Sequence, residues 1–74
     1  METKRTLEDA KKELNNNVLI LENKNTILLF NKDEYIVSKK TIWCQVFTKL
    51  GKFKYHYLMN NDWRLYKRLH DQLN

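Results

Sequence analysis

The stretch that decides the fold is residues 41–60, TIWCQVFTKLGKFKYHYLMN. Side chains alternate between two faces in its first half, and one face carries Ile42, Cys44 and Val46. Gly51 can adopt the positive φ that a tight turn needs, so we predict a β-hairpin with strands at 41–48 and 53–59. The side chains predicted to face the core from the second strand are Phe53, Tyr55, Tyr57 and Met59.

Upstream of this hairpin, the sequence predicts a helix followed by short strands. Thr6 is suited to cap a helix that continues to the asparagines at 15–17, which favour a turn. Residues 18–22 and 26–31 are rich in β-branched and aliphatic side chains and predict a second hairpin. A further short strand is expected at residues 35–38.

Downstream, the sequence predicts a C-terminal helix. Asn60, Asn61 and Asp62 are three consecutive candidate N-caps, and apolar side chains then follow helical spacing from Trp63 to Leu73. We therefore predict an α+β fold with an N-terminal helix, an antiparallel sheet of four to five short strands, and a C-terminal helix packed on the sheet. The length of 74 residues allows one small domain, residues 1–74.

The positive charge of the chain is concentrated in its second half. The net charge is +5, made up of −1 over residues 1–37 and +6 over residues 38–74. This asymmetry favours an anionic partner, either nucleic acid or an acidic protein. The side chains that would contact nucleic acid are Lys49, Lys52, Lys54, Arg64, Lys67 and Arg68.

The residue types needed for catalysis are scarce. The chain has one serine (Ser38), one cysteine (Cys44), two histidines and one glycine, and no spacing resembles a zinc site or a phosphate-binding loop. Cys44 alternates with apolar residues and is predicted to be buried in the core. We expect no enzymatic activity, no metal and no cofactor.

The distribution of apolar residues indicates neither a membrane span nor a signal peptide. The apolar runs at 18–21 and 27–30 are four residues long, whereas a span needs about 20. The N-terminus is charged and lacks the apolar stretch of a signal peptide, so we expect a cytoplasmic protein. A thin core also favours a homodimer. Its expected contributors are Trp43, Phe47, Trp63 and Tyr66.

One short segment resembles a known docking motif. The sequence TILLF at residues 26–30 resembles the peptide by which bacterial polymerases and repair proteins dock on the DNA sliding clamp, of the form Gln-Leu-Ser/Asp-Leu-Phe. Ile27, Leu29 and Phe30 match its apolar anchors, whereas Thr26 replaces the glutamine and Leu28 replaces a polar residue. A buried hairpin strand is the alternative interpretation of the same residues.

The size and the Lys- and Asn-rich composition resemble the small early proteins of lytic phages, including staphylococcal phage inhibitors of the host sliding clamp. This resemblance implies an inhibitor of host DNA replication that acts in the host cytoplasm by occluding the clamp. The alternative is a small basic regulatory protein that binds nucleic acid. The residues expected to contact a protein partner are Ile27, Leu29, Phe30, Trp43, Trp63 and Tyr66.

Overall fold

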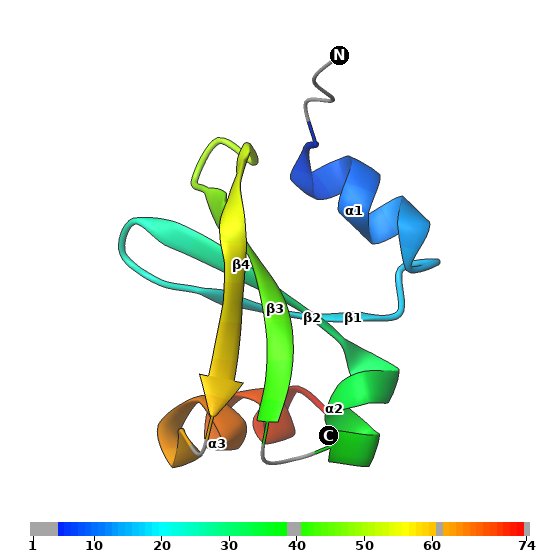
Figure 1. Ribbon diagram of the computed structural model, residues 1–74, viewed down its shortest axis with the longest axis vertical. Coiled ribbons are helices and arrows are strands. Elements are labelled where there is room, and N and C mark those ends of the chain that lie inside the picture. Colours follow the sequence, from blue (N-terminus) through cyan, green and yellow to red (C-terminus); the bar gives the residue numbers. More distant parts are fainter. Residues whose placement is uncertain (1–4, 39–40, 61, 74) are drawn as a thin grey trace.

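A computed structural model describes residues 5–38, 41–60 and 62–73 and confirms the α+β architecture (Figure 1). Helices flank an antiparallel sheet, with one helix before it, one inserted in its middle and one after it. The elements are α1 (Leu7–Glu13), β1 (Val18–Glu22), β2 (Thr26–Asn31), α2 (Lys32–Ser38), β3 (Thr41–Thr48), β4 (Phe53–Asn60) and α3 (Trp63–Gln72).

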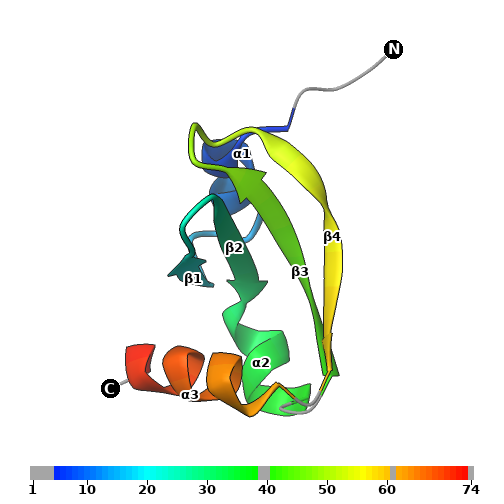
Figure 2. The ribbon, with the colours of Figure 1, turned by 90° about the vertical axis from the view of Figure 1, so that its left-hand side faces the viewer.

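The four strands follow one another across the sheet in the order β1-β2-β3-β4. Each strand pairs antiparallel with its neighbour in sequence, so β1 and β4 are the two edges. Figure 1 shows β3 and β4 running across the direction of β1 and β2, which is the appearance of a strongly twisted sheet. In Figure 2 the two edge strands lie on opposite sides of the view.

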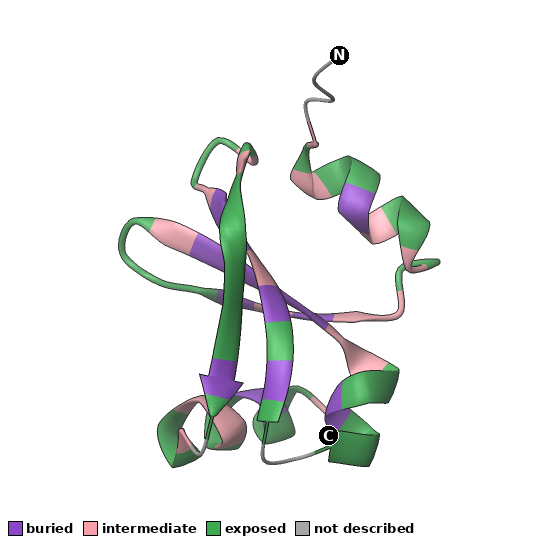
Figure 3. Ribbon diagram, in the orientation of Figure 1, coloured by how far each residue is buried: buried purple, intermediate pink, exposed green. Residues whose placement is uncertain are grey.

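The sheet buries side chains on both faces. We call the face that packs on α2 and α3 the α3 face, and the one that packs on α1 the α1 face. Figure 3 shows the buried positions concentrated on β1, β2 and β3. The strand residues buried on the α3 face are Leu19, Leu21, Leu28, Phe30, Ile42, Cys44, Val46 and Met59. Those on the α1 face are Ile27, Leu29 and Phe47.

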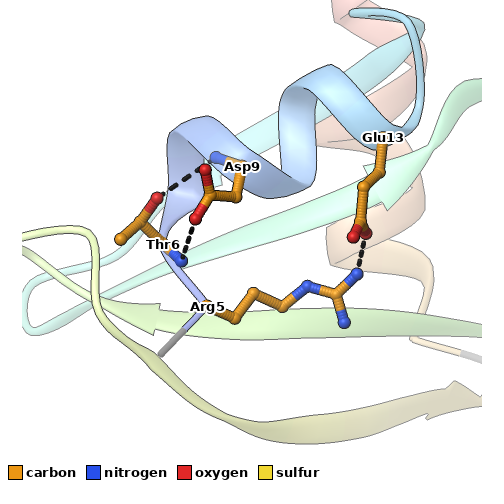
Figure 4. A network of polar contacts seen from close by, with 4 residues as sticks. All are labelled: Arg5, Thr6, Asp9 and Glu13. Carbon is orange, nitrogen blue, oxygen red and sulfur yellow. Dashed lines mark hydrogen bonds and ion pairs between the residues drawn. The ribbon is translucent and has the colours of Figure 1, made fainter. Parts of the chain in front are cut away.

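The N-terminal helix begins and ends as its sequence predicts. Thr6 and Asp9 form a capping box, in which the side chain of each accepts a hydrogen bond from the backbone N–H of the other (Figure 4). The side chain of Arg5, which precedes the helix, forms an ion pair with Glu13, the last residue of the helix. At the C-terminal end, Asn15 and Asn16 adopt φ of 54° and 60°, a conformation that asparagine tolerates better than most residues.

The segment predicted as a strand at residues 35–38 is instead part of α2, so that prediction is wrong. Asn31 explains the difference, because its Oδ1 accepts hydrogen bonds from the N–H groups of Asp33 (2.9 Å) and Glu34 (3.3 Å) and so caps the helix. The two acids also lie in the first helical turn, where the helix dipole favours them. Tyr35 is buried against the sheet from this helix.

The last hairpin contains an irregularity that the alternating pattern does not reveal. Val46 pairs with Tyr55 but Phe47 pairs with Phe53, so β4 carries one extra residue at this point. Phe53 consequently packs on the α1 face, whereas Tyr55 and Tyr57 lie on the α3 face.

The predicted burial of Tyr55 and Tyr57 is wrong, because both are exposed. The helices on the α3 face pack mainly against β1, β2 and β3, so β4 extends beyond their cover. Met59 is buried as predicted. At the start of α3, Asp62 is the N-cap and accepts from the N–H groups of Arg64 and Leu65, while Asn61 lies outside the described residues.

Candidate functional site

The outer edge of β1 is closed by side chains from α3. Gln72 accepts a hydrogen bond from the backbone N–H of Ile20 (3.2 Å) and donates its Nε2 to the carbonyl of the same residue (2.5 Å). Arg68 donates to the carbonyl of Glu22 (3.1 Å) and to the side chain of Asn23 (3.2 Å). These contacts occupy the backbone groups through which another strand would pair.

The outer edge of β4 is closed only at its beginning. The N–H of Phe53 donates to the carbonyl of Arg5 (3.0 Å), and the N–H of Leu7 donates to the carbonyl of Gly51 (2.8 Å). Beyond Phe53, no segment among the described residues pairs with the outer side of β4. We call residues 54–58 the open stretch.

Backbone groups of the open stretch point outward. The N–H of Thr48 donates to the carbonyl of Lys52 (2.8 Å), so Thr48 and, by alternation along β3, Val46 and Cys44 direct their backbone groups toward β4. Their partners Tyr55 and Tyr57 therefore face β3, and the N–H and C=O groups of His56 and Leu58 face away from the sheet.

Large apolar side chains flank the open stretch on both faces. Trp43 and Leu58 are cross-strand partners on the α1 face, with exposed fractions of 57% and 37%. On the α3 face, Tyr55 and Tyr57 are 51% and 42% exposed. We call these four residues the β4 surface; Figure 3 shows most of β4 as exposed. The four side chains form two exposed pairs on opposite faces of the sheet, so a partner that contacts all four must extend around the edge formed by β4.

A hollow adjoins the β4 surface on the α1 face. Its volume is about 190 Å³, and Trp43, Gln45 and His56 are among the residues that line it. The Oε1 atom of Gln45 is buried without a hydrogen-bond partner among the described residues, and because solvent does not reach this atom, a molecule in the hollow would not reach it either.

The hairpin that carries the β4 surface is positively charged. Residues 41–60 contain Lys49, Lys52 and Lys54 and no acidic residue. All three lysines are exposed, and the Nζ of Lys54 lies 5.8 Å from the ring centroid of Tyr55. Lys49 lies 3.4 Å from Glu22 on β1, which offsets its charge, so Lys52 and Lys54 account for most of the positive charge of the hairpin.

The six residues expected to bind a protein partner lie in different environments. Ile27, Leu29 and Phe30 are buried in β2, as the alternative interpretation of TILLF predicts, so the folded sheet does not present them to a partner. Trp43 and Trp63 are exposed, and only Trp43 belongs to the β4 surface.

Tyr66, the sixth of these residues, is half-buried against the core next to α2. Its ring centroid lies 5.9 Å from that of Tyr35, and the Tyr35 hydroxyl donates to the Tyr66 carbonyl (3.2 Å). Burial raises the pKa of both phenols, and the nearby Tyr35 raises that of Tyr66 further. Phe47, expected at a dimer interface, is fully buried.

The six predicted nucleic-acid contacts are exposed but belong to two groups. Lys49, Lys52 and Lys54 lie on the hairpin around the turn and β4, whereas Arg64, Lys67 and Arg68 lie on α3. Arg68 is engaged in closing the β1 edge. Arg64 lies 5.6 Å from the ring of Trp63, a cation–π distance.

Groups that could carry chemistry are either buried or dispersed. Cys44 is 2% exposed, as predicted, and burial raises its pKa to about 11 although the Tyr57 backbone hydrogen bond acts in the opposite direction. Among residues 5–38, 41–60 and 62–73, no three His, Cys, Asp or Glu side chains gather as metal ligands would. No described helix combines the length and the apolar character needed to cross a bilayer.

The sequence contains a signal for the β4 surface in its aromatic residues Trp43, Tyr55 and Tyr57, but alternation alone predicts that both tyrosines belong to the core.

Comparison with known proteins finds no matching family model, no similar curated protein and no similar solved structure.

Proposed function

We propose that this is a non-enzymatic binding protein that attaches to a partner protein through the β4 surface. The observation that carries the proposal is the exposure of Trp43, Tyr55, Tyr57 and Leu58 on both sides of an open edge strand. Tryptophan and tyrosine are the residues that most often dominate the binding energy of protein interfaces.

The charge of the hairpin supports an acidic partner. Its three lysines would attract an acidic surface and speed association, while the aromatic side chains would supply most of the affinity. The candidate partner is a host replication protein, in first place the sliding clamp, because a ring that encircles DNA has a more acidic exterior than its channel. Inhibition would be steric, by exclusion of polymerase or of DNA.

The structure changes the residues through which such binding would occur. Because Ile27, Leu29 and Phe30 are buried, their role is to support β2, and the contact with the partner is assigned to the β4 surface. Replacement of Phe30 with Ala would destabilise the fold by about 3–5 kcal/mol and is therefore not a test of binding.

Titration calorimetry of a purified bacterial sliding clamp with Trp43→Ser tests the proposal. We expect this change to weaken association at least about tenfold, since interface tryptophans commonly contribute more than 1.4 kcal/mol. Val37→Ser is the matched control, because Val37 is 81% exposed but lies on α2. Absence of heat with the clamp at both low and moderate salt would exclude this partner.

A specific observation also favours the second candidate function, nucleic-acid binding. Tyr55 and Tyr57 are exposed beside Lys54, and stacking of bases on rings next to cations is how single strands are bound. Mobility shifts on single-stranded and duplex DNA at two salt concentrations would reveal it, because phosphate contacts weaken steeply with salt. Charge reversal at Lys54 should weaken such binding strongly, whereas charge reversal at Arg64 and Lys67, which lie apart from it on α3, should leave the binding largely unchanged.

A further inference from the structure

Resting on the proposed function, we infer that the partner binds by strand addition: an extended acidic segment pairs with the open stretch of β4 and becomes a fifth strand of the sheet. Backbone hydrogen bonds would then supply part of the affinity, and side chains would supply specificity.

The backbone of the open stretch has the geometry that strand addition needs. His56 and Leu58 turn their N–H and C=O groups outward, and these groups lie between Phe53, which is already bonded to Arg5, and Met59, which is buried. The opposite edge of the sheet is unsuitable, because Gln72 occupies both backbone groups of Ile20.

The side chains around the open stretch indicate which residue types the bound segment should have at alternate positions. A strand placed beside β4 would direct successive side chains to the two faces of the sheet. On the α3 face they would lie beside Tyr55 and Tyr57, which favours apolar residues. On the α1 face they would lie beside His56 and Leu58, the β4 residues that share this face with Gln45 and Trp43 of β3.

Charge selects an acidic segment over a second copy of this chain. Antiparallel pairing of two open stretches would place the turns of the two hairpins, with their lysines, at opposite ends of the joined strands. A second copy therefore offers these lysines no opposite charge, whereas an acidic segment would gain from them. The occupant is therefore a segment that alternates apolar and acidic residues.

Two variants at His56 distinguish the contribution of its backbone N–H to binding from that of its side chain. The probe is a seven-residue peptide of alternating Val and Glu with capped ends, and binding is followed by the NMR shifts of β4 amides. His56→Pro removes the outward N–H and leaves the ladder to β3 intact, as proline permits on an edge strand. We expect it to weaken binding about tenfold, and His56→Ala to change it less than about twofold. Equal affinities in the two variants would overturn strand addition.

Amide exchange of the unaltered protein makes the test independent of whether His56→Pro folds. Saturating Val-Glu peptide should slow hydrogen exchange at the amides of His56 and Leu58, because they become donors to the added strand. Exchange at these two amides that stays unchanged while the Tyr55 and Tyr57 side-chain signals shift would overturn the proposal.

Charge exchange tests the acidic character of the segment. Lys54→Glu should weaken binding of the Val-Glu peptide and strengthen binding of a matched Val-Lys peptide. Loss of binding to both peptides, with the fold retained, would show that the charge of Lys54 does not select the ligand.

The other occupants give different results. A dimer in sedimentation at high micromolar concentration that His56→Pro dissociates would assign the edge to a second copy. Oligothymidine that displaces the peptide and shifts the same amides would assign it to nucleic acid. If Trp43→Ser abolishes clamp binding but His56→Pro does not, the proposed function stands and strand addition is wrong. If the peptide binds and the clamp does not, only the choice of clamp is wrong.

Discussion

The two edge strands of the sheet, β1 and β4, differ in how far other parts of the chain cover their outward backbone groups. Along the outer edge of β1, Gln72 and Arg68 of α3 hydrogen-bond the backbone of Ile20 and the carbonyl of Glu22. Along the outer edge of β4, the backbone hydrogen bonds found among the described residues join the Arg5–Leu7 segment to Gly51 in the turn and to Phe53, the first residue of the strand. Figure 2 shows α3 on the same side of the molecule as β1 and far from the upper part of β4.

This difference indicates which edge is available for binding. An exposed edge strand invites association, and proteins commonly cover such edges or place charges along them. Here the cover is on β1, while β4 combines a backbone edge that no described segment covers beyond Phe53 with exposed aromatic rings and lysines. We therefore expect the contacts that close the β1 edge to contribute to stability and the exposed groups of β4 to contribute to binding.

The largest expected effect comes from removing the side chain that holds α3 on the sheet. Leu69 is completely buried, and it lies on α3 between Arg68 and Gln72 in the sequence, the two residues that contact the β1 edge. Leu69→Ala should lower the free energy of unfolding by about 2–5 kcal/mol, because it leaves a cavity in the core. Denaturant titration followed by circular dichroism measures the loss. A loss below about 1 kcal/mol would mean that α3 does not hold the β1 edge closed.

A smaller effect is expected from pH, through the thiol beneath β4. Burial raises the pKa of Cys44 to about 11, above its ordinary value of 9.0, so the folded protein retains this proton after the unfolded chain has lost it. The stabilisation is therefore fully present below pH 9 and is lost as the pH rises toward 11, by about 1–2 kcal/mol. Denaturant titrations between pH 8 and 11 should show a steeper decline for the native sequence than for Cys44→Ala. Parallel declines in the two proteins would contradict burial of the thiol.

Closure of the β1 edge can be removed with one substitution. Gln72→Ala deletes both hydrogen bonds to Ile20 and should cost about 1 kcal/mol, because water can replace them. Thermal unfolding measures this cost, and Asp71→Ala is a control on the same helix, since no hydrogen bond of Asp71 is described. If the two variants lose equal stability, the Gln72 contacts do not protect the edge.

The smallest effect on stability is expected at the β4 surface. Tyr57→Ser should change the free energy of unfolding by less than about 0.5 kcal/mol, because Tyr57 is 42% exposed and contributes little to the core. Denaturant titration gives this value, and partner binding should fall in the same variant. A loss above about 2 kcal/mol would place Tyr57 in the core and leave the β4 surface without its apolar flank.

Most of the fold follows from local signals. Thr6, Gly51 and Asp62 mark turns and helix starts at the observed positions, and alternation identifies β3. The segment at 35–38 was mistaken for a strand because Ile36 and Val37 are β-branched, while the capping side chain, Asn31, lies several residues earlier.

The candidate site could be predicted only in part. Trp43 is among the predicted partner contacts, but the exposure of Tyr55 and Tyr57 depends on how far the helices extend across the sheet. The extra residue of β4 opposite Val46 and Phe47 moves Phe53 to the other face. Both are properties of tertiary packing, which alternation within one strand does not encode. The continuous apolar run of TILLF, in contrast, is a local signal for a strand buried on both faces, which is what β2 is.

Amide hydrogen exchange in the unbound protein tests the difference between the edges most directly. The amide of Ile20 should exchange slowly, because it donates to Gln72, whereas the amides of His56 and Leu58 should exchange rapidly, because they face solvent. Slow exchange at His56 and Leu58 in a protein that sediments as a monomer would contradict the account, since the β4 edge would then already be closed.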